Sequence, residues 1–291
     1  MEILDFKNHK WKVEVMLAVV TYSTKSYENA RKYNVKMAYK KGKADRVFEY
    51  CEKDLSQEFI EKNKNILSCK RGGGYWIWKP YVVKKAMKQL KVGDYLFYCD
   101  SGAFVIKDLH ILAEYMERNQ TDMMLFDLDH KEREFTKRDV FLKLGCDEKY
   151  YVDTLQRCAT YFLLKKSHHT EKFVEQWLSY VQNYDLISDE DNSLYHMQNY
   201  DGFRENRHDQ SIFSVLSKKE GFRSFQDISQ YRYPRGFCKR MKAKIREKKN
   251  VEYPVFVCIH RQKSADFTSA FREAVLNYIP GLSRYLHYGY H

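Results

Sequence analysis

The sequence predicts an α/β fold with a largely parallel central sheet. Short apolar runs rich in β-branched residues alternate along the chain with longer segments of helical period. The 291 residues, 44% of them hydrophobic, are enough to build a full hydrophobic core. No internal repeat or low-complexity linker divides the chain, so we expect one main domain.

The first half of the chain predicts strands that are each followed by a helix. The strands are expected at 13–23 and 44–50, with a third that ends in polar residues at Asp100, and the helices at 27–41, 56–67 and 109–119. The helix at 56–67 begins with Ser56 and has Glu58 near its first turn, which is the pattern of a capped helix.

The second half continues the alternation. We expect strands at 123–129, 159–167 and 254–261, and helices at 171–181 and 208–219. The core is assigned to 1–229. A basic C-terminal region, 230–291, is expected to complete the site with its strand and to end in an amphipathic helix at 266–279.

Polar residues stand where two of the predicted strands end. In open α/β sheets, ligands bind beyond the carboxyl ends of the strands. Thr21, Tyr22, Asp100 and Ser101 all fall at such ends, so we expect them to contribute to one ligand site.

Composition limits the class of partner. The formal net charge of +12 indicates an anionic partner, which can be nucleic acid, an acidic membrane or a phosphorylated small molecule. The seven cysteines are scattered without a C-x-x-C pair, so a disulfide framework and a zinc site are not expected. The sequence shows neither a signal-peptide pattern nor an apolar stretch of membrane-spanning length. We therefore expect a cytoplasmic protein whose membrane contact, if any, is peripheral.

The segment "YLFYCDSGAFVIKDL" (95–109) carries the first candidate for chemistry. A carboxylate at the end of a buried strand is well placed to hold Mg²⁺ or Mn²⁺ on a diphosphate. A strand-end aspartate that caps the following turn is an equally simple interpretation of Asp100.

The same segment resembles the D-x-D region of GT-A-fold glycosyltransferases, which use nucleotide-sugar donors, and its glycogenin-like branch in particular. Asp100 falls on the first Asp, Val105 on the apolar anchor, and Asp108 with Leu109 on the closing pair. The resemblance implies Mn²⁺ or Mg²⁺ at Asp100, but Gly102 replaces the second Asp and removes a metal ligand.

A literal D-x-D occurs at Asp127 and Asp129. The charged run that follows it is typical of a solvated surface, and the apolar anchor is missing. We therefore interpret these two residues as exposed acids at a strand end.

"ENRHDQSIFSVL" (205–216) resembles the helix start of retaining GT-A enzymes, including the blood-group-transferase-like branch. The resemblance implies that Asp209 accepts hydrogen bonds from donor-sugar hydroxyls and that Gln210 lies under the anomeric carbon, with His208 beside the donor. The alternative is an ordinary helix N-cap, which needs no substrate.

"VFVCIHRQK" (255–263) ends a predicted strand with a histidine. Glycogenin-like enzymes use a late histidine as a metal ligand, which implies that role for His260, and nearby basic residues on the diphosphate, which implies Arg261 and Lys263. A lone histidine is more often structural, so both interpretations stay open. The pair His168 and His169 begins a helix, is expected to face solvent, and is assigned no metal.

"RGGGYWIWKPY" (71–81) combines glycine, aromatic and basic residues. The glycines would let backbone approach a ligand, and the aromatic rings suit a sugar or a nucleobase. A lysine supplies charge for phosphate, and Pro80 fits the first turn of a helix. The residues assigned to donor binding here are Arg71, Tyr75, Trp76, Trp78 and Lys79.

The alternative for this stretch is a turn whose aromatic rings fill the core. We expect one of the tryptophans to be buried and the other to face the site. The pattern does not match a P-loop. It resembles a stretch found in bacterial polysaccharide-type glycosyltransferases, and the resemblance as a whole covers 13–261.

The segment 231–250 is strongly basic, with nine Lys or Arg residues against one Glu. Together with the amphipathic segment after it, it suits docking on an anionic membrane. An ordinary solvated surface explains the pattern equally well. No nucleic-acid-binding motif accompanies it, so nucleic acid is not an expected partner.

These observations predict a hexosyltransferase. It would move a hexose, with retention, from a nucleotide diphosphate sugar such as a UDP-sugar to a glycan or lipid-linked acceptor in surface polysaccharide synthesis. One alternative is an inverting enzyme with Asp189, Glu190 or Asp191 as general base. The other is a non-catalytic RNA- or membrane-binding module that uses the basic segment.

Overall fold

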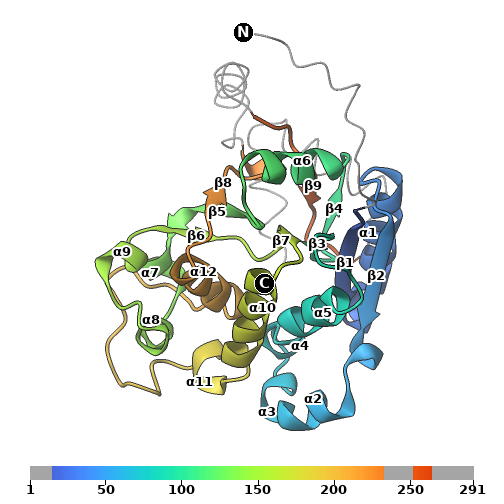
Figure 1. Cartoon of the computed structure of the whole chain (residues 1–291). Helices are drawn as coiled ribbons and strands as arrows, with labels where there is room; N and C mark the ends of the chain where they lie inside the picture. The colour runs from blue at the N-terminus through green and yellow to red at the C-terminus, as the bar shows by residue number, and fades with distance from the viewer. Residues whose placement is uncertain (1–14, 233–251, 264–291) are drawn as a thin grey trace, which may run out of the picture.

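The computed structural model describes residues 15–232 and 252–263, and a seven-stranded sheet forms its centre (Figure 1). The strand order is β2-β1-β3-β7-β5-β6, and β8 also pairs with β5. The strands are β1 (Leu17–Ser23), β2 (Arg46–Cys51), β3 (Tyr95–Cys99), β5 (Met123–Lys131), β6 (Leu155–Arg157), β7 (Tyr161–Lys165) and β8 (Ser224–Phe225).

Five of these seven strands run in the same direction. Strand β1 pairs in parallel with β2 and β3, while β7 pairs antiparallel with both β3 and β5. Strand β8 is parallel to β5, and β6 is antiparallel to it. The predicted α/β class with a mostly parallel sheet is therefore confirmed, with β6 and β7 as the two reversed strands.

Helices cover both faces of the sheet, so its central strands are buried on both sides. In β1, Leu17 and Val19 belong to the apolar cluster under α1 and α6, whereas Ala18 and Val20 belong to the cluster under α5, α10 and α12. This alternation follows from the two-residue period of a strand. The five longest α-helices in the described part of the chain are α1 (Glu28–Lys40), α5 (Trp78–Met87), α6 (His110–Arg118), α10 (His168–Val181) and α12 (Asp209–Lys219).

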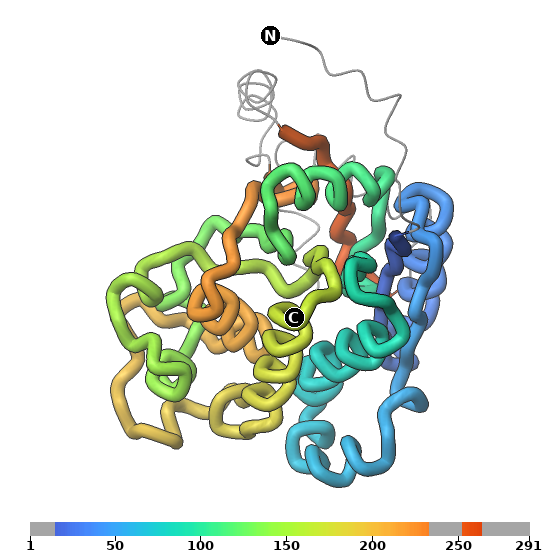
Figure 2. Tube along the Cα trace, in the orientation of Figure 1, coloured from blue at the N-terminus to red at the C-terminus, as the bar shows by residue number. Residues whose placement is uncertain are grey.

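Helices α5, α10 and α12 lie side by side on one face, as the chain trace in Figure 2 shows. Shorter elements connect the main ones. The short α-helices are α2 (Gln57–Lys62), α3 (Lys64–Leu67), α4 (Gly72–Tyr75), α7 (Glu132–Phe135), α8 (Arg138–Leu144), α9 (Lys149–Val152) and α11 (Tyr184–Ile187). The 3₁₀ turns are η1 (Lys25–Tyr27), η2 (Glu52–Asp54) and η3 (Gln230–Arg232).

The capped helix predicted at 56–67 is present but divided into α2 and α3. The hydroxyl of Ser56 accepts a hydrogen bond from the backbone N–H of Phe59 at 3.2 Å, as an N-cap should. The break falls at Asn63, whose side-chain amide donates to the carbonyl of Phe59 at 2.7 Å.

A small second sheet joins the C-terminal region to the core. Strand β9 (Val257–Ile259) pairs antiparallel with β4 (Ala103–Val105), which directly follows the turn at Asp100. The backbone N–H groups of His260 and Arg261 both donate to the carbonyl of Gly102 at 2.9 Å. The late strand predicted at 254–261 is therefore present, and it brings Arg261 beside the end of β3.

The structure does not describe the rest of the C-terminal region for which the sequence makes predictions. The basic run beyond Arg232 and the amphipathic helix predicted at 266–279 lie outside the described residues. Among the helices that are described, none has the length and apolar character needed to cross a membrane.

Candidate functional site

A cavity of about 620 Å³ opens at the carboxyl ends of β1 and β3, against the first turn of α12. This is the edge of the sheet at which the sequence predicts a ligand. The cavity brings together most of the predicted site residues from distant parts of the chain. Those that line it are Tyr22, Arg71, Trp76, Trp78, Lys79, Asp100, Ser101, His208, Asp209, Gln210 and Arg261.

The ammonium group of Lys79 lies between the two acids of the cavity. Its Nζ is 2.8 Å from Oδ2 of Asp209 and 3.5 Å from Oδ1 of Asp100. It also donates to the backbone carbonyl of Ala159 at 3.1 Å. Lys79 is only 3% exposed, so its buried charge depends on two ion pairs and one hydrogen bond to the backbone.

The charges of this cluster depend on one another. Burial disfavours the charge of Lys79, but the carboxylates of Asp100 and Asp209 outweigh burial and raise its pKa above the ordinary value. Burial raises the pKa of Asp209 to about 6, although Lys79 opposes that shift. Tyr98 donates its hydroxyl to Oδ1 of Asp100 at 2.5 Å and so orients that carboxylate from below.

Aromatic rings form one wall of the cavity. Trp78 stacks on Tyr22 with ring centroids 4.0 Å apart, and its indole N–H donates to the carbonyl of Gly72 at 3.0 Å. Trp78 is 5% exposed, whereas Trp76 is half-buried. The division that the sequence predicts, with one tryptophan buried and one open to the site, is therefore seen in the structure.

His208 is enclosed by rings from the glycine-rich stretch. Its imidazole stacks on Tyr75 at 4.6 Å and on Trp76 at 5.5 Å between centroids. Burial lowers the pKa of His208 to about 4, so the ring is neutral near pH 7. Its Nδ1 lies 2.7 Å from the carbonyl of Ile187, to which a neutral ring donates from that nitrogen.

The three glycines adopt left-handed backbone conformations for a reason other than the predicted one. A Cβ on Gly73 would lie 2.9 Å from Cγ2 of Thr24, and a Cβ on Gly74 would lie 2.8 Å from Cα of Leu67. The space beside these backbones is therefore filled by the protein itself. Gly72 and Gly73 line the cavity, but close packing within the chain is what requires glycine here.

Replacing Gly74 by Ala is expected to lower the free energy of unfolding by about 2–4 kcal/mol, from left-handed strain plus overlap with α3. Gly93 is the matched control, because its φ of +95° equals the +92° of Gly74 within a few degrees and nothing lies within 4 Å of its Cβ position. Gly93→Ala should cost only the backbone part, about 1–2 kcal/mol. Urea denaturation of both variants measures the difference, and equal losses would show that packing at Gly74 is not the constraint.

The side chain of Gln210 is fixed by two hydrogen bonds. Its Oε1 accepts from the backbone N–H of Ala159 at 3.1 Å, and its Nε2 donates to Oε1 of Gln156 at 2.9 Å. The backbone carbonyl of Asp209 accepts from the indole N–H of Trp177 at 3.1 Å. The first turn of α12 is thus tied to β6 and to α10, and the two residues predicted to be catalytic are held in one orientation.

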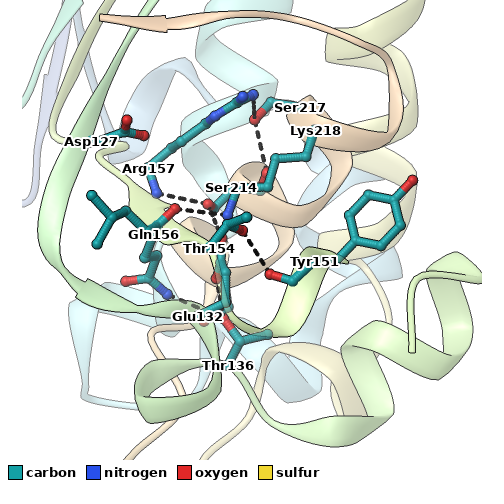
Figure 3. Close-up of polar contacts among 12 residues, drawn as sticks. Asp127, Glu132, Thr136, Tyr151, Thr154, Gln156, Arg157, Ser214, Ser217 and Lys218 are labelled. Atoms are coloured by element: carbon teal, nitrogen blue, oxygen red, sulfur yellow. Dashed lines mark hydrogen bonds and ion pairs between the residues drawn. The ribbon is translucent and has the colours of Figure 1, made fainter. Parts of the chain in front are cut away.

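A buried polar network, shown in Figure 3, supports α12 from behind the cavity. Glu132 of α7 is fully buried and accepts hydrogen bonds from the hydroxyls of Thr136 and Ser214. The ammonium of Lys218 lies 2.6 Å from the same carboxylate. Ser214 in turn accepts from the backbone N–H of Arg157 at 2.7 Å. This network fixes α12 against α7 and β6.

Two cationic side chains that sequence reasoning did not assign also line the cavity. They are Arg207 and Lys70. The guanidinium of Arg207 lies 3.8 Å above the ring of Phe135, and its Nη1 is 2.9 Å from Nε2 of His130. Arg207 stands two residues before Asp209, and this adjacency was the signal that could have identified it.

Four predicted site residues do not line the cavity. Thr21 is fully buried inside β1, and Tyr75 packs behind His208. Lys263 is exposed, and its backbone carbonyl accepts from the N–H of Ala30 at 3.3 Å. The fourth, His260, is the predicted metal ligand.

His260 is 4% exposed and lies outside the cavity lining, and its buried Nε2 has no hydrogen-bond partner among the described residues. Nδ1 accepts from the backbone N–H of Gln262 at 3.1 Å, so a neutral ring carries its proton on Nε2. Burial lowers the pKa of His260 to about 4, and the Ser101 backbone offsets part of that shift. The ring packs against Phe104 at 5.8 Å. These contacts favour the structural interpretation of His260 over a metal-ligand role.

The alternative acids also lie outside the cavity lining. Asp189 forms an ion pair with Arg71 at 2.8 Å, and Glu190 accepts from the hydroxyl of Tyr184 at 3.0 Å. Asp191 is exposed. In the literal D-x-D, Asp127 accepts from Ser224 at 2.7 Å, and Asp129 is fully exposed.

The described residues do not supply the ligand set for the divalent cation that the resemblance implies. Within 15–232 and 252–263, no group of three or more His, Cys, Asp or Glu side chains converges on one point. Gly102 contributes no side chain, and the positive charge of Lys79 stands 3.5 Å from the one remaining strand-end acid. A cation at Asp100 would face this fixed charge.

Comparisons with known proteins place the chain beside solved glycosyltransferase structures. No family model and no curated protein matches the sequence. The bifunctional glycosyltransferase WbbM is similar over 92% of this chain, with 11% identity and a TM-score of 0.46, and this chain spans about half (51%) of the WbbM chain. Mouse xyloside xylosyltransferase 1 is similar over 84% of this chain and 97% of its own, with 10% identity and a TM-score of 0.44.

The galactosyltransferase LgtC, solved in complex with donor and acceptor sugar analogues, is similar over 92% of this chain and 99% of its own. The identity is 15% and the TM-score 0.42.

Proposed function

We propose that the protein is a glycosyltransferase that moves a hexose from a nucleoside diphosphate sugar to a glycan acceptor. The observation that carries the proposal is the composition of the cavity at the carboxyl ends of β1 and β3. Stacked aromatic rings, cationic side chains and the acids Asp100 and Asp209 line one space of about 620 Å³. These are the groups needed for the ring systems, the diphosphate and the sugar hydroxyls of one donor.

Each wall of the cavity suits one part of such a donor. Trp76 and the stacked pair of Tyr22 and Trp78 offer flat surfaces for a nucleobase or a sugar ring. Arg207 and Arg261 can donate to phosphate oxygens in bidentate fashion. The carboxylate of Asp209 can accept hydrogen bonds from sugar hydroxyls.

In the transfer step, the bond between the anomeric carbon and the diphosphate oxygen breaks, and its electron pair leaves with the nucleoside diphosphate. The acceptor oxygen forms the new bond to the anomeric carbon, and its proton passes to the departing phosphate oxygen. The cationic side chains stabilise the charge that develops on that oxygen. Gln210 is fixed by Ala159 and Gln156. By the resemblance to retaining enzymes its amide would lie beside the anomeric carbon, so we propose transfer with retained configuration.

A nucleotide panel tests the proposal directly. UDP, GDP, CDP and ADP are each added to the full chain, and the melting temperature is recorded with Mn²⁺ and with EDTA. At least one nucleotide, with UDP expected first, should raise the melting temperature, because a ligand that binds only the folded state stabilises it. The corresponding nucleotide sugar should be hydrolysed slowly. The absence of any shift under both conditions would exclude a nucleotide-sugar enzyme and favour the binding-module alternative.

The acceptor and the cellular site belong to the same proposal. A cytoplasmic enzyme that builds surface polysaccharide on a lipid-linked acceptor would use the basic segment at 231–250 to reach an anionic membrane. Neutralising Lys242, Lys244, Lys248 and Lys249 should then reduce sedimentation with anionic vesicles and leave donor hydrolysis unchanged. Unchanged vesicle binding would leave the segment as a solvated surface.

A further inference from the structure

The cavity is lined by more cationic than acidic side chains, whereas a site for a divalent cation needs acidic ligands. Five cationic side chains line it: Lys70, Arg71, Lys79, Arg207 and Arg261. Three acids line it: Asp100, Glu205 and Asp209. Arg71 is already paired with Glu205 and with Asp189 outside the lining, but the lining still carries more positive than negative side chains before any metal ion is added, which suits an anionic diphosphate.

Lys79 occupies the position between the two acids. The ammonium lies 2.8 Å from Asp209 and 3.5 Å from Asp100, and it is held in place by the carbonyl of Ala159. These oxygens are the type of ligand that Mg²⁺ and Mn²⁺ prefer. A fixed lysine charge here offsets one of the two negative charges that would otherwise repel phosphate.

Two arginines, Arg207 and Arg261, reach the cavity and can contact the phosphates. Both guanidinium groups line the same cavity, and that of Arg207 is held over the ring of Phe135 at 3.8 Å, with its Nη1 2.9 Å from Nε2 of His130. The nearest carboxylate, that of Glu205, is 3.9 Å from Nε of Arg207. Two like charges that line one cavity are complementary to a bound anion.

We infer that this site binds the donor diphosphate without a divalent cation, with Lys79 in the place of the metal ion and Arg207 and Arg261 as the phosphate contacts. The inference rests on the proposed function, since it concerns the same cavity. It also explains why Gly102 can stand where the resemblance implies a second metal-binding Asp. When the glycosyl bond breaks, the electron pair moves to a diphosphate oxygen that faces fixed cations of the protein.

The decisive measurement compares binding of UDP and of inorganic pyrophosphate to the full chain in EDTA and in Mn²⁺, by calorimetry. The dissociation constant should change by less than about threefold between the two conditions, because the protein itself supplies the cations. Binding that appears only with Mn²⁺ would overturn the inference and leave the proposed function standing. Absence of nucleotide binding in both conditions would instead remove the proposed function.

Single substitutions test which side chains bind the phosphates without a metal ion. In EDTA, Arg207→Gln and Arg261→Gln should each weaken pyrophosphate binding about tenfold or more, as loss of a charge-assisted contact does. Arg207 and Arg261 are less buried than Lys79, so their replacement should not prevent folding. The two variants can therefore test the inference even if Lys79→Gln does not fold. Lys84→Gln is the control, because Lys84 lies on the same helix as Lys79, pairs with Glu175 at 3.0 Å and is not part of the cavity lining. Unchanged binding in both arginine variants would contradict the assignment.

Lys79→Gln gives a second, independent readout. The substitution leaves Asp100 and Asp209 facing each other without their shared cation. Mn²⁺ alone should then raise the melting temperature of this variant and leave that of the wild type unchanged. A wild type that gains as much from Mn²⁺ as the variant does would show that Lys79 does not take the place of the metal.

Discussion

Asp209→Asn is expected to lower the rate of sugar transfer about a thousandfold, which is the upper range for loss of one preorganised electrostatic group. The substitution keeps the shape of the side chain but removes the negative charge that lies 2.8 Å from Lys79. Lys79 would then pair with Asp100 alone, and the sugar hydroxyls would lose a charged acceptor. Initial rates with the nucleotide sugar identified by the panel measure the effect.

Asp127→Asn is the matched control for Asp209→Asn. Asp127 is also a partly buried acid, in the middle of β5, and burial raises its pKa as well. It accepts a hydrogen bond from Ser224 and lies outside the cavity. Its replacement should leave the rate within about twofold of the wild type, as expected for a site remote from the chemistry. Equal losses in the two variants would mean that Asp209 acts only through general stability.

The pKa of Asp209 also predicts how the rate of sugar transfer falls at acid pH. Because burial raises the pKa of Asp209 to about 6, its carboxylate becomes protonated as the pH falls through that value. The rate should therefore decline below about pH 6, since the ionised form is the one that accepts hydrogen bonds from the donor. The residual activity of Asp209→Asn should lack this limb, and a limb that persists would point to another acid.

Glu132→Ala is expected to reduce the free energy of unfolding by about 3–5 kcal/mol, because it leaves the buried ammonium of Lys218 without its counter-charge. The hydroxyls of Thr136 and Ser214 would lose their acceptor at the same time. Burial already lowers the pKa of Lys218, so this charge depends on Glu132. Chemical denaturation followed by circular dichroism gives the value.

Two further variants test whether the loss of stability comes from leaving a buried charge unpaired. Glu175→Ala breaks the exposed pair with Lys84 and should change stability by no more than about 0.5 kcal/mol. Glu132→Leu combined with Lys218→Met removes both buried charges and should recover much of the loss, since the unpaired charge is the main cost. If Glu132→Ala is no worse than Glu175→Ala, the network in Figure 3 does not hold α12.

The fold class could be read from the sequence because its signals are local. Apolar runs such as 13–23 correspond to strands, and the Ser56 cap opens a helix where its pattern predicts one. Strand ends bearing Tyr22 and Asp100 meet at one edge of the sheet, since parallel strands end on the same side. The direction of β7 carries no such signal, because an apolar run reads the same whether it pairs parallel or antiparallel.

The sequence by itself predicted the main strands and helices, the edge of the sheet at which the cavity lies and about half of the residues that line it. Only the tertiary structure decided what those side chains do to one another. Lys79 and Asp209 stand far apart in the chain, and their contact at 2.8 Å depends on how α5 and α12 pack on the sheet. His260 matches the residue type of a metal ligand, but the N–H of Gln262 occupies its lone pair. Residue types and spacing record which groups are available, whereas burial and partners, which arise from long-range packing, fix their charge and their role.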